Sequence, residues 1–197
     1  MLTNASRLVD CPILSLHVGG EIARITELVV NPHNLKIVAF RVDGPLIRDE
    51  VGDILPIESV REFSSAGAIV DSIDDFINGE EVIRINDVLK LNFALVGLKV
   101  VTKQKTKLGK VIDYILDTDA WQIHQIVVHR PLMKSFLDPE LVISRQKIVE
   151  VTDYEVIVKD ETEKSQRKES APASTDFVPN FINPFREPGF AAESKTK

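Results

Sequence analysis

The sequence is poor in the residues that build disulfide-linked, metal-bound or membrane-embedded proteins. It holds one cysteine, Cys11, in 197 residues, which excludes an internal disulfide and a site with several cysteine ligands, and is compatible with a cytoplasmic location. No apolar run approaches the roughly 18–20 residues that a membrane-spanning helix needs. The first residues show no basic segment followed by an apolar core, so we expect neither a membrane span nor a signal peptide.

Positive charge is also scarce. The 24 lysines and arginines stand against 30 aspartates and glutamates, and a net charge of −6 argues against a general nucleic-acid-binding surface. The imbalance lies in residues 1–90, which carry −7, whereas residues 91–159 carry +2. The two parts differ in electrostatic character, so a homo-oligomer in which one part attracts the other part of a second copy is one possibility.

The residue patterns of common catalytic and cofactor sites are missing. The Gly19-Gly20 pair precedes a strand pattern rather than a helix, so no phosphate-binding loop is predicted. The acidic residues from Asp71 to Glu81 lack the order of a calcium-binding loop, and no thiolates or carboxylates are spaced to complete a metal site with the histidines. We therefore predict no catalytic residue, metal or cofactor, and interpret Cys11 as an inert thiol. The four histidines are His17, His33, His124 and His129.

What the sequence does contain is an internal repeat. With an offset of 86 positions, the apolar and polar pattern of residues 24–45 matches that of residues 110–131. Beyond this point the offset becomes 88, so that residues 60–70 match residues 148–158, and a two-residue insertion after Pro131 reconciles the two offsets. Identities are few, but the agreement over about 50 residues predicts a duplicated domain.

Each copy is patterned as short strands rich in valine and isoleucine. The turns between successive strands are long enough for antiparallel hairpins and too short for parallel crossovers. The pattern predicts an all-β fold made of two small barrels in tandem. The expected strands are Ile22–Val30, Leu35–Val42, Ser59–Phe63 and Ala68–Asp71 in the first copy, and Gly109–Asp117, Trp121–Val128, Lys147–Val151 and Glu155–Lys159 in the second.

These patterns divide the chain into four parts. Between the barrels, Ser72–Asn78 and Ile85–Leu89 are each predicted to hold a helical turn, the second capped by Asn86 or Asp87. Each barrel is small for independent stability, so we expect the two to pack as a rigid pair. The parts are a first barrel domain at 1–80, a short helical linker at 81–92, a second barrel domain at 93–160, and a disordered tail at 161–197.

The tail carries an aromatic segment after a polar linker. Residues 177–190 hold four of the nine phenylalanines of the chain, and three prolines in the same segment forbid a continuous helix. We expect an extended or polyproline-like docking peptide. Docking onto the protein's own barrels and docking onto another protein both fit the pattern. The predicted partner contacts are Phe177, Phe181, Phe185 and Phe190.

Five lysines lie in the 12 residues from Lys99 to Lys110. Lys103, Lys105 and Lys107 alternate, so on a strand they would project from one face. Such a face attracts an acidic protein surface or phosphates, or protects an edge strand from pairing with other chains. No aromatic residues interleave to stack bases. We interpret these lysines as an electrostatic contact, with a protein favoured over RNA or an anionic lipid.

Both copies resemble the PRC-barrel domain. In the second copy Gly109, Val111 and Asp113 fit the G-x-V-x-D strand of that family, and in the first copy Leu55-Pro56 fits its later L-P-x-x-x-V strand. The resemblance covers most of residues 10–159. The departures are Ala23 and Glu27 in the first copy and Ile143-Ser144 in the second.

The resemblance implies an adaptor. The family includes the cytoplasmic domain of the photosynthetic reaction-centre H subunit and the C-terminal domain of a ribosome maturation factor, and its barrels bind other proteins. We therefore expect a non-enzymatic adaptor or scaffold that binds other proteins in a larger cytoplasmic assembly. The alternatives are an RNA- or ribosome-associated assembly factor that uses the basic face from Lys99 to Lys110, and a small-ligand-binding protein with its site between the barrels.

Overall fold

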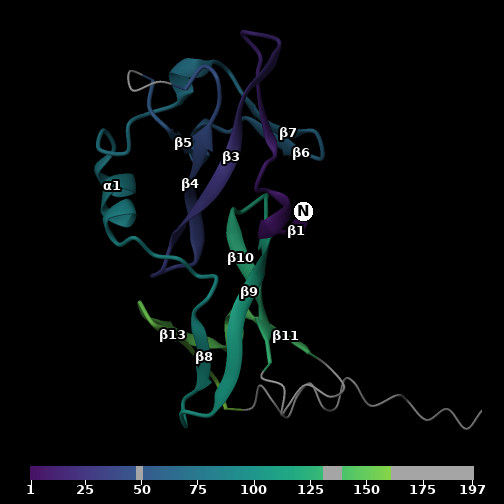
Figure 1. Ribbon diagram of the computed structural model, residues 1–197, viewed down its shortest axis with the longest axis vertical. Helices are drawn as coiled ribbons and strands as arrows, with labels where there is room; N and C mark the ends of the chain where they lie inside the picture. Colours follow the sequence, from purple (N-terminus) through teal and green to yellow (C-terminus); the bar gives the residue numbers. More distant parts are fainter. Residues whose placement is uncertain (48–50, 131–138, 161–197) are drawn as a thin grey trace, which may run out of the picture.

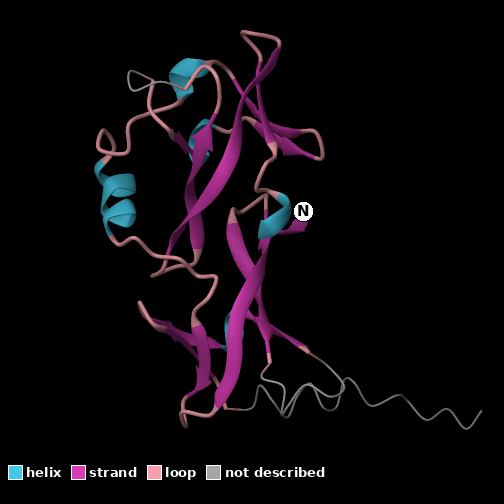
Figure 2. Ribbon diagram, viewed as in Figure 1, coloured by secondary structure: helices cyan, strands magenta, loops and turns pink. Residues whose placement is uncertain are grey.

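The protein is described here by a computed structural model, which covers residues 1–47, 51–130 and 139–160. These residues form mostly β-strands, with a single α-helix among them (Figures 1 and 2). The all-β class expected from the sequence is confirmed. The four predicted phenylalanine contacts in the tail lie outside the described residues.

Among the described residues, 12–70 and 99–158 share the same order of six strands, with a 3₁₀ helix between the fourth strand and the fifth. The first half holds β1 (Leu2–Asn4), β2 (Pro12–Ser15), β3 (Gly20–Asn31), β4 (Lys36–Asp43), β5 (Ile54–Pro56), β6 (Glu62–Ser64) and β7 (Gly67–Val70), with the 3₁₀ helices η1 (Ala5–Arg7), η2 (Ile57–Ser59) and η3 (Ile73–Asp75). The α-helix α1 (Ile83–Lys90) connects the halves. The second half holds β8 (Lys99–Thr102), β9 (Lys107–Asp117), β10 (Gln122–His129), β11 (Glu140–Ser144), η5 (Arg145–Lys147), β12 (Ile148–Val151) and β13 (Glu155–Val158).

Hydrogen bonding joins all the described strands into one open sheet. Its main path runs β12-β13-β8-β9-β10-β4-β3-β2-β7-β6, with β1, β5 and β11 attached at the side. The expectation of two separate closed barrels is not met. Closing each half would require β5 to pair with β6 and β11 to pair with β12, and among the described residues neither ladder forms. The 3₁₀ turns η2 and η5 intervene at these places, and β5 ends in Pro56, which has no N–H to donate.

The second half repeats the strand pairing of the first, residue for residue. Leu28 lies opposite Phe40 in the β3–β4 hairpin, and Tyr114 lies opposite Ile126 in the β9–β10 hairpin, both at an offset of 86. The parallel pairs β2–β7 and β13–β8 and the antiparallel pairs β4–β5 and β10–β11 also correspond. Even the irregularities recur, since each long hairpin has two register shifts at equivalent positions.

The correspondence extends further toward the N-terminus than the sequence pattern indicated. Asp10 and Gly97 both adopt a positive φ, 66° and 94°. The Asp10 N–H donates to the carbonyl of Ile25, and the Gly97 N–H donates to the carbonyl of Val111, at 2.8 Å in each case. The segments that lead into β2 and β8 are therefore equivalent as well, at an offset of 87. The domain limits at 80, 92 and 160 stay predictions, because one sheet runs through both halves.

The two halves meet at the tips of their long hairpins through a reciprocal contact. The Ile37 N–H donates to the Trp121 carbonyl at 2.8 Å, and the Ile123 N–H donates to the Leu35 carbonyl at 2.9 Å. Leu35 and Trp121 are equivalent positions, as are Ile37 and Ile123, so the pairing has the form of a two-fold contact between like surfaces. Both Leu35 and Trp121 adopt positive φ values, 57° and 49°.

Side-chain packing strengthens this contact. The Trp121 ring meets Phe40 and Phe63 of the first half edge to face, with ring centroids 5.3 and 5.4 Å away. One continuous hydrophobic core, which includes Phe40 and Ile126, contains buried residues from both halves. The N-terminal strand β1 adds a second link, because it pairs with β9 of the other half.

The linker helix makes the two halves unequal. Ile85 and Val88 of α1 pack on Val29, Ala39 and Ile54, so the first hairpin is buried on both faces (Figure 1). The equivalent positions in the second half are Ile115, Gln125 and Val142, and Val142 is 37% exposed. No second helix among the described residues covers that face.

The helix within the linker begins two residues earlier than the helical turn predicted at Ile85–Leu89. The helix starts at Ile83 with Val82 as its N-cap, not at a cap formed by Asn86 or Asp87. The turn predicted in Ser72–Asn78 is present as η3, where Ser72 and Asp75 form a reciprocal capping box.

Gly109 of the family-like motif occupies a crowded point of the β9–β10 hairpin. Its φ is 154°, and a Cβ there would lie 2.0 Å from the His129 carbonyl oxygen. In the first half the equivalent residue is Ala23, and the glycine stands across from it as Gly44, whose Cβ would lie 2.7 Å from the Ala23 Cα. Each hairpin thus has one glycine where its two chain segments come closest together. The glycine belongs to the first strand in the second half and follows the second strand in the first half.

Gly109→Ala is expected to lower the free energy of unfolding by about 2 kcal/mol or more, because the new methyl group meets a backbone carbonyl at a φ that L-residues rarely adopt. Urea denaturation measures this. The matched control is Gly20→Ala, where nothing lies within 4 Å of the added Cβ. Equal stability of the Gly109 variant and wild type would contradict the assignment.

Candidate functional site

A groove between the two halves forms a concave site on the described surface, with a volume of about 230 Å³. It is lined by the middle of β3, the middle of β9, the segment around η1, and the residues that follow α1. The lining residues are Ala5, Ser6, Val9, Thr26, Glu27, Leu28, Val30, Phe93, Ala94, Leu95, Val96, Ile112, Asp113 and Tyr114.

Equivalent residues of the two halves line the groove from its two sides. Residues 26–28 of β3 and residues 112–114 of β9 line it from equivalent positions at an offset of 86. Val9 and Val96 are equivalent at an offset of 87 and are 41% and 51% exposed. The contact between the hairpins thus creates the groove, which neither half forms alone.

A β-bulge in each half directs a side chain toward the groove. Thr26 and Ile112 are the extra residues at equivalent register shifts, so neither has a partner on the neighbouring strand. Bulges re-aim side chains and occur near functional surfaces. Ile112 is 43% exposed, and with Val9 and Val96 it gives the groove an apolar rim.

The polar groups of the groove are mainly engaged in structure. The Asp113 carboxylate accepts hydrogen bonds from Asn4 Nδ2 at 3.0 Å and from Ser6 Oγ at 2.7 Å, which fixes η1 against β9. Glu27, at the equivalent position, accepts from Arg41 Nε at 3.2 Å. Asp113, the aspartate of the G-x-V-x-D pattern, therefore has a structural role, because it holds the N-terminal segment of the chain against β9.

Tyr114 lies at the base of the groove and is 5% exposed. Burial raises the pKa of its hydroxyl well above the usual range, and the charges of Asp113 and Glu27 raise it further. The hydroxyl therefore stays protonated at physiological pH. An uncharged apolar group fits this surface, whereas an anion would face the two carboxylates.

The predicted basic face is arranged differently from the expectation. Lys103 and Lys105 lie in the β8–β9 turn, and only Lys107 begins a strand, so the three do not alternate along one strand. Lys105 Nζ donates to Glu155 Oε1 at 2.6 Å. Lys99 and Lys110 lie directly opposite each other in the β8–β9 ladder. The lysines still gather at one end of the second half, with acidic side chains among them.

The acidic residues after β7 and the single cysteine make hydrogen bonds that stabilise the local backbone. Asp75 accepts from the N–H groups of Asp71 and Ser72, at 2.9 Å each, as part of the η3 cap. The Cys11 thiol donates to the Arg7 carbonyl at 3.0 Å, and burial raises the pKa of that thiol, which reduces the thiolate fraction at neutral pH. Within residues 1–47, 51–130 and 139–160, no group of three or more His, Cys, Asp or Glu side chains is placed to hold a metal ion.

No protein-family model matches the chain, and no curated protein matches it either. The resemblance to the PRC-barrel family therefore stays a prediction. Among the described helices, none is both long enough and apolar enough to cross a membrane.

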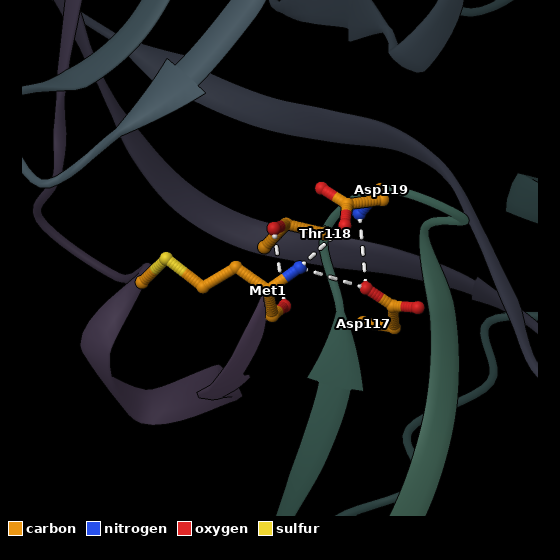
Figure 3. A network of polar contacts seen from close by, with 4 residues as sticks. All are labelled: Met1, Asp117, Thr118 and Asp119. Carbon is orange, nitrogen blue, oxygen red and sulfur yellow. Dashed lines mark hydrogen bonds and ion pairs between the residues drawn. The ribbon is translucent and has the colours of Figure 1, made fainter.

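A cluster of charges at the hairpin tip holds the first residue of the chain (Figure 3). The Met1 ammonium group lies 3.0 Å from Asp117 Oδ1 and 2.7 Å from Asp119 Oδ2. The Met1 carbonyl accepts from both the backbone N–H and the hydroxyl of Thr118, at 2.9 and 3.1 Å. These contacts fasten β1 across the β9–β10 turn of the other half.

The attachment of β1 is expected to depend on pH at both ends of the scale. Hydrogen bonds to Asp119 and Asp117 raise the pKa of the Met1 amine above 8.0, so its contribution is complete below pH 8.0 and is lost as pH rises through the raised pKa. The same amine lowers the pKa of Asp117 below 3.8, so that contribution is complete above pH 3.8 and is lost as pH falls through the lowered pKa.

Hydrogen-exchange protection of the Thr118 N–H measures this attachment, because that group donates to Met1. We expect the highest protection between pH 4 and 8. In N-terminally acetylated protein the amine cannot titrate, so the alkaline loss of protection should disappear. Identical alkaline profiles for the free and the acetylated protein would contradict the assignment.

Proposed function

We propose that this protein is a non-enzymatic adaptor that binds other proteins in a larger assembly, with the aromatic segment 177–190 as a main contact. The observation that carries the proposal is the placement of four phenylalanines among three prolines in a segment that cannot form a continuous helix. Burial of each phenylalanine contributes roughly 2–3 kcal/mol, so three anchors suffice for micromolar binding after the ordering costs.

The folded part supports an adaptor role with exposed sheet edges. The main strand path ends at β6 and at β12, and within the described residues no strand pairs with the outer side of either. Such edges accept an extended segment of a partner by strand addition. Val149 on β12 is 44% exposed and provides an apolar side chain beside one of them.

A capture experiment tests this function. The full chain and a variant with Phe177, Phe181, Phe185 and Phe190 changed to serine are used as baits in lysate of the source organism, and bound proteins are quantified by mass spectrometry. At least one partner should fall about tenfold or more with the variant, since loss of roughly 1.4 kcal/mol already gives a factor of ten. An unchanged set of partners would remove the aromatic segment from the proposed function.

A second candidate is an RNA- or ribosome-associated assembly factor. The gathering of the lysines at the β8–β9 end favours it, since Lys99 and Lys110 face each other there in register. A variant with Lys103, Lys105 and Lys107 changed to glutamate should lose co-sedimentation with ribosomal particles if this candidate is right. Co-sedimentation that persists in this variant would count against the electrostatic contact. The same lysine variant, used as a bait in the capture experiment, shows whether any captured protein depends on these charges.

A further inference from the structure

We propose that the groove between the two halves binds the aromatic segment 177–190 of the same chain and seats one of its phenyl rings. The proposal adds an intramolecular contact to the function above and does not depend on the existence of an external partner. It rests on the size and chemistry of the groove and on the point at which the described chain ends.

The groove has the size and surface for a phenyl ring. A cavity of about 150 Å³ lined by Leu, Ile and Phe accommodates benzene, and the groove measures about 230 Å³. Its rim exposes three apolar side chains, Val9, Val96 and Ile112, from three separate segments.

The negative charge of the groove lining disfavours anionic ligands such as those that carry a phosphate. Glu27 and Asp113 both place a carboxylate in the lining. A phosphate-bearing ligand would be repelled by these groups, whereas a phenyl ring between prolines brings no charge into the site. An aromatic segment without net charge, such as 177–190, in which Arg186 is balanced by Glu187, is therefore the occupant that the lining favours.

The described part of the chain ends at Asp160, within reach of the groove. Asp160, the last described residue, lies at the β8–β9 turn, where its carboxylate accepts from the Gln104 N–H at 3.0 Å. From that turn β9 runs directly to the groove, since Lys107 begins the strand and Ile112 lines the site. At about 3.3 Å per residue, Asp160 lies roughly 20 Å from the groove.

The segment between Asp160 and Phe177 matches this distance. It comprises residues 161–176 and has the polar composition of a linker. Sixteen residues of flexible linker have a root-mean-square length of about 20–24 Å. When linker length and span agree, the attached segment is held at an effective concentration of millimolar order, so a contact with a millimolar dissociation constant is occupied about half of the time. The seated phenyl ring supplies only part of that affinity, and contacts of the neighbouring residues of the segment with the groove rim supply the rest.

Amide chemical shifts of the purified full chain test the proposal. Wild type is compared with the variant in which the four phenylalanines of the segment are changed to serine. A control variant carries Asn180→Ser and Asn183→Ser, which change the same segment without removing a ring. We expect the phenylalanine variant, and not the control, to shift the amides of residues 26–28, 94–96 and 112–114. Unchanged groove amides, or shifts confined to other parts of the surface, would overturn the proposal.

Two further measurements identify the occupant. Ile112→Glu should abolish the difference between wild type and the phenylalanine variant, whereas Leu16→Glu, at an exposed apolar position outside the groove lining, should preserve it. If Ile112→Glu fails to fold, the phenylalanine comparison still decides. The shifts should persist over about a tenfold dilution, because the contact is intramolecular. Shifts that vanish on dilution would show the tail of a second copy in the groove and would overturn an intramolecular contact.

These outcomes are distinct from those of the capture experiment. Purified protein contains no partner, so a failed capture leaves the groove contact intact, and unchanged groove amides leave the adaptor function intact. If the groove contact and the adaptor function are both correct, a partner that binds the aromatic segment must displace it from the groove. Partner capture should then rise in Ile112→Glu and stay at the wild-type level in Leu16→Glu.

Discussion

The reciprocal contact between the two hairpin tips is the constraint on which the rest of the structure depends. Two hydrogen bonds, from Ile37 to Trp121 and from Ile123 to Leu35, relate the halves by an approximate two-fold axis. The Trp121 ring then reaches into the first half and packs on Phe40 and Phe63. Because a repeat of this size has little core of its own, joining two of them into one core supplies the buried apolar surface that each lacks.

The groove follows from this geometry. The two long hairpins meet at their tips, and their bulges, at Thr26 and Ile112, line the same depression. The two sides have diverged at the bulge, where polar Thr26 corresponds to apolar Ile112, whereas Glu27 and Asp113 are both acidic. Asp113 also anchors η1, which closes one side of the groove. The site is therefore a product of duplication followed by unequal change, as is the one-sided cover that α1 provides.

Local patterns in the sequence predicted the repeat and most of the strands. Valine and isoleucine alternation placed β3, β4, β9 and β10 within a few residues, and the offsets of 86 and 88 reappear in the strand registers. The short strands β2 and β8 were missed because four residues carry too little periodicity. The start of α1 was misplaced because Val82 offers no side-chain cap to recognise.

Features that depend on distant residues were not predictable in this way. Whether a sheet closes is decided by pairing between strands far apart, so the expectation of two barrels was wrong while the strands themselves were largely right. The lysine spacing was interpreted as a strand, although the chain turns at Lys103 and Lys105. The groove is lined by several segments that are far apart in the sequence. The only sequence signal for two of them was the similarity of Leu8-Val9 to Leu95-Val96, which the repeat comparison did not include.

Trp121 provides a direct readout of the contact between the halves, since it is the single tryptophan of the chain. Equilibrium unfolding followed by its fluorescence and by far-ultraviolet circular dichroism should give coincident transitions, and calorimetry should give a ratio of calorimetric to van't Hoff enthalpy of about one. That result is expected if the shared core makes the halves a single cooperative unit. Two separated transitions, with the fluorescence change preceding the loss of secondary structure, would mean that each half folds without the other.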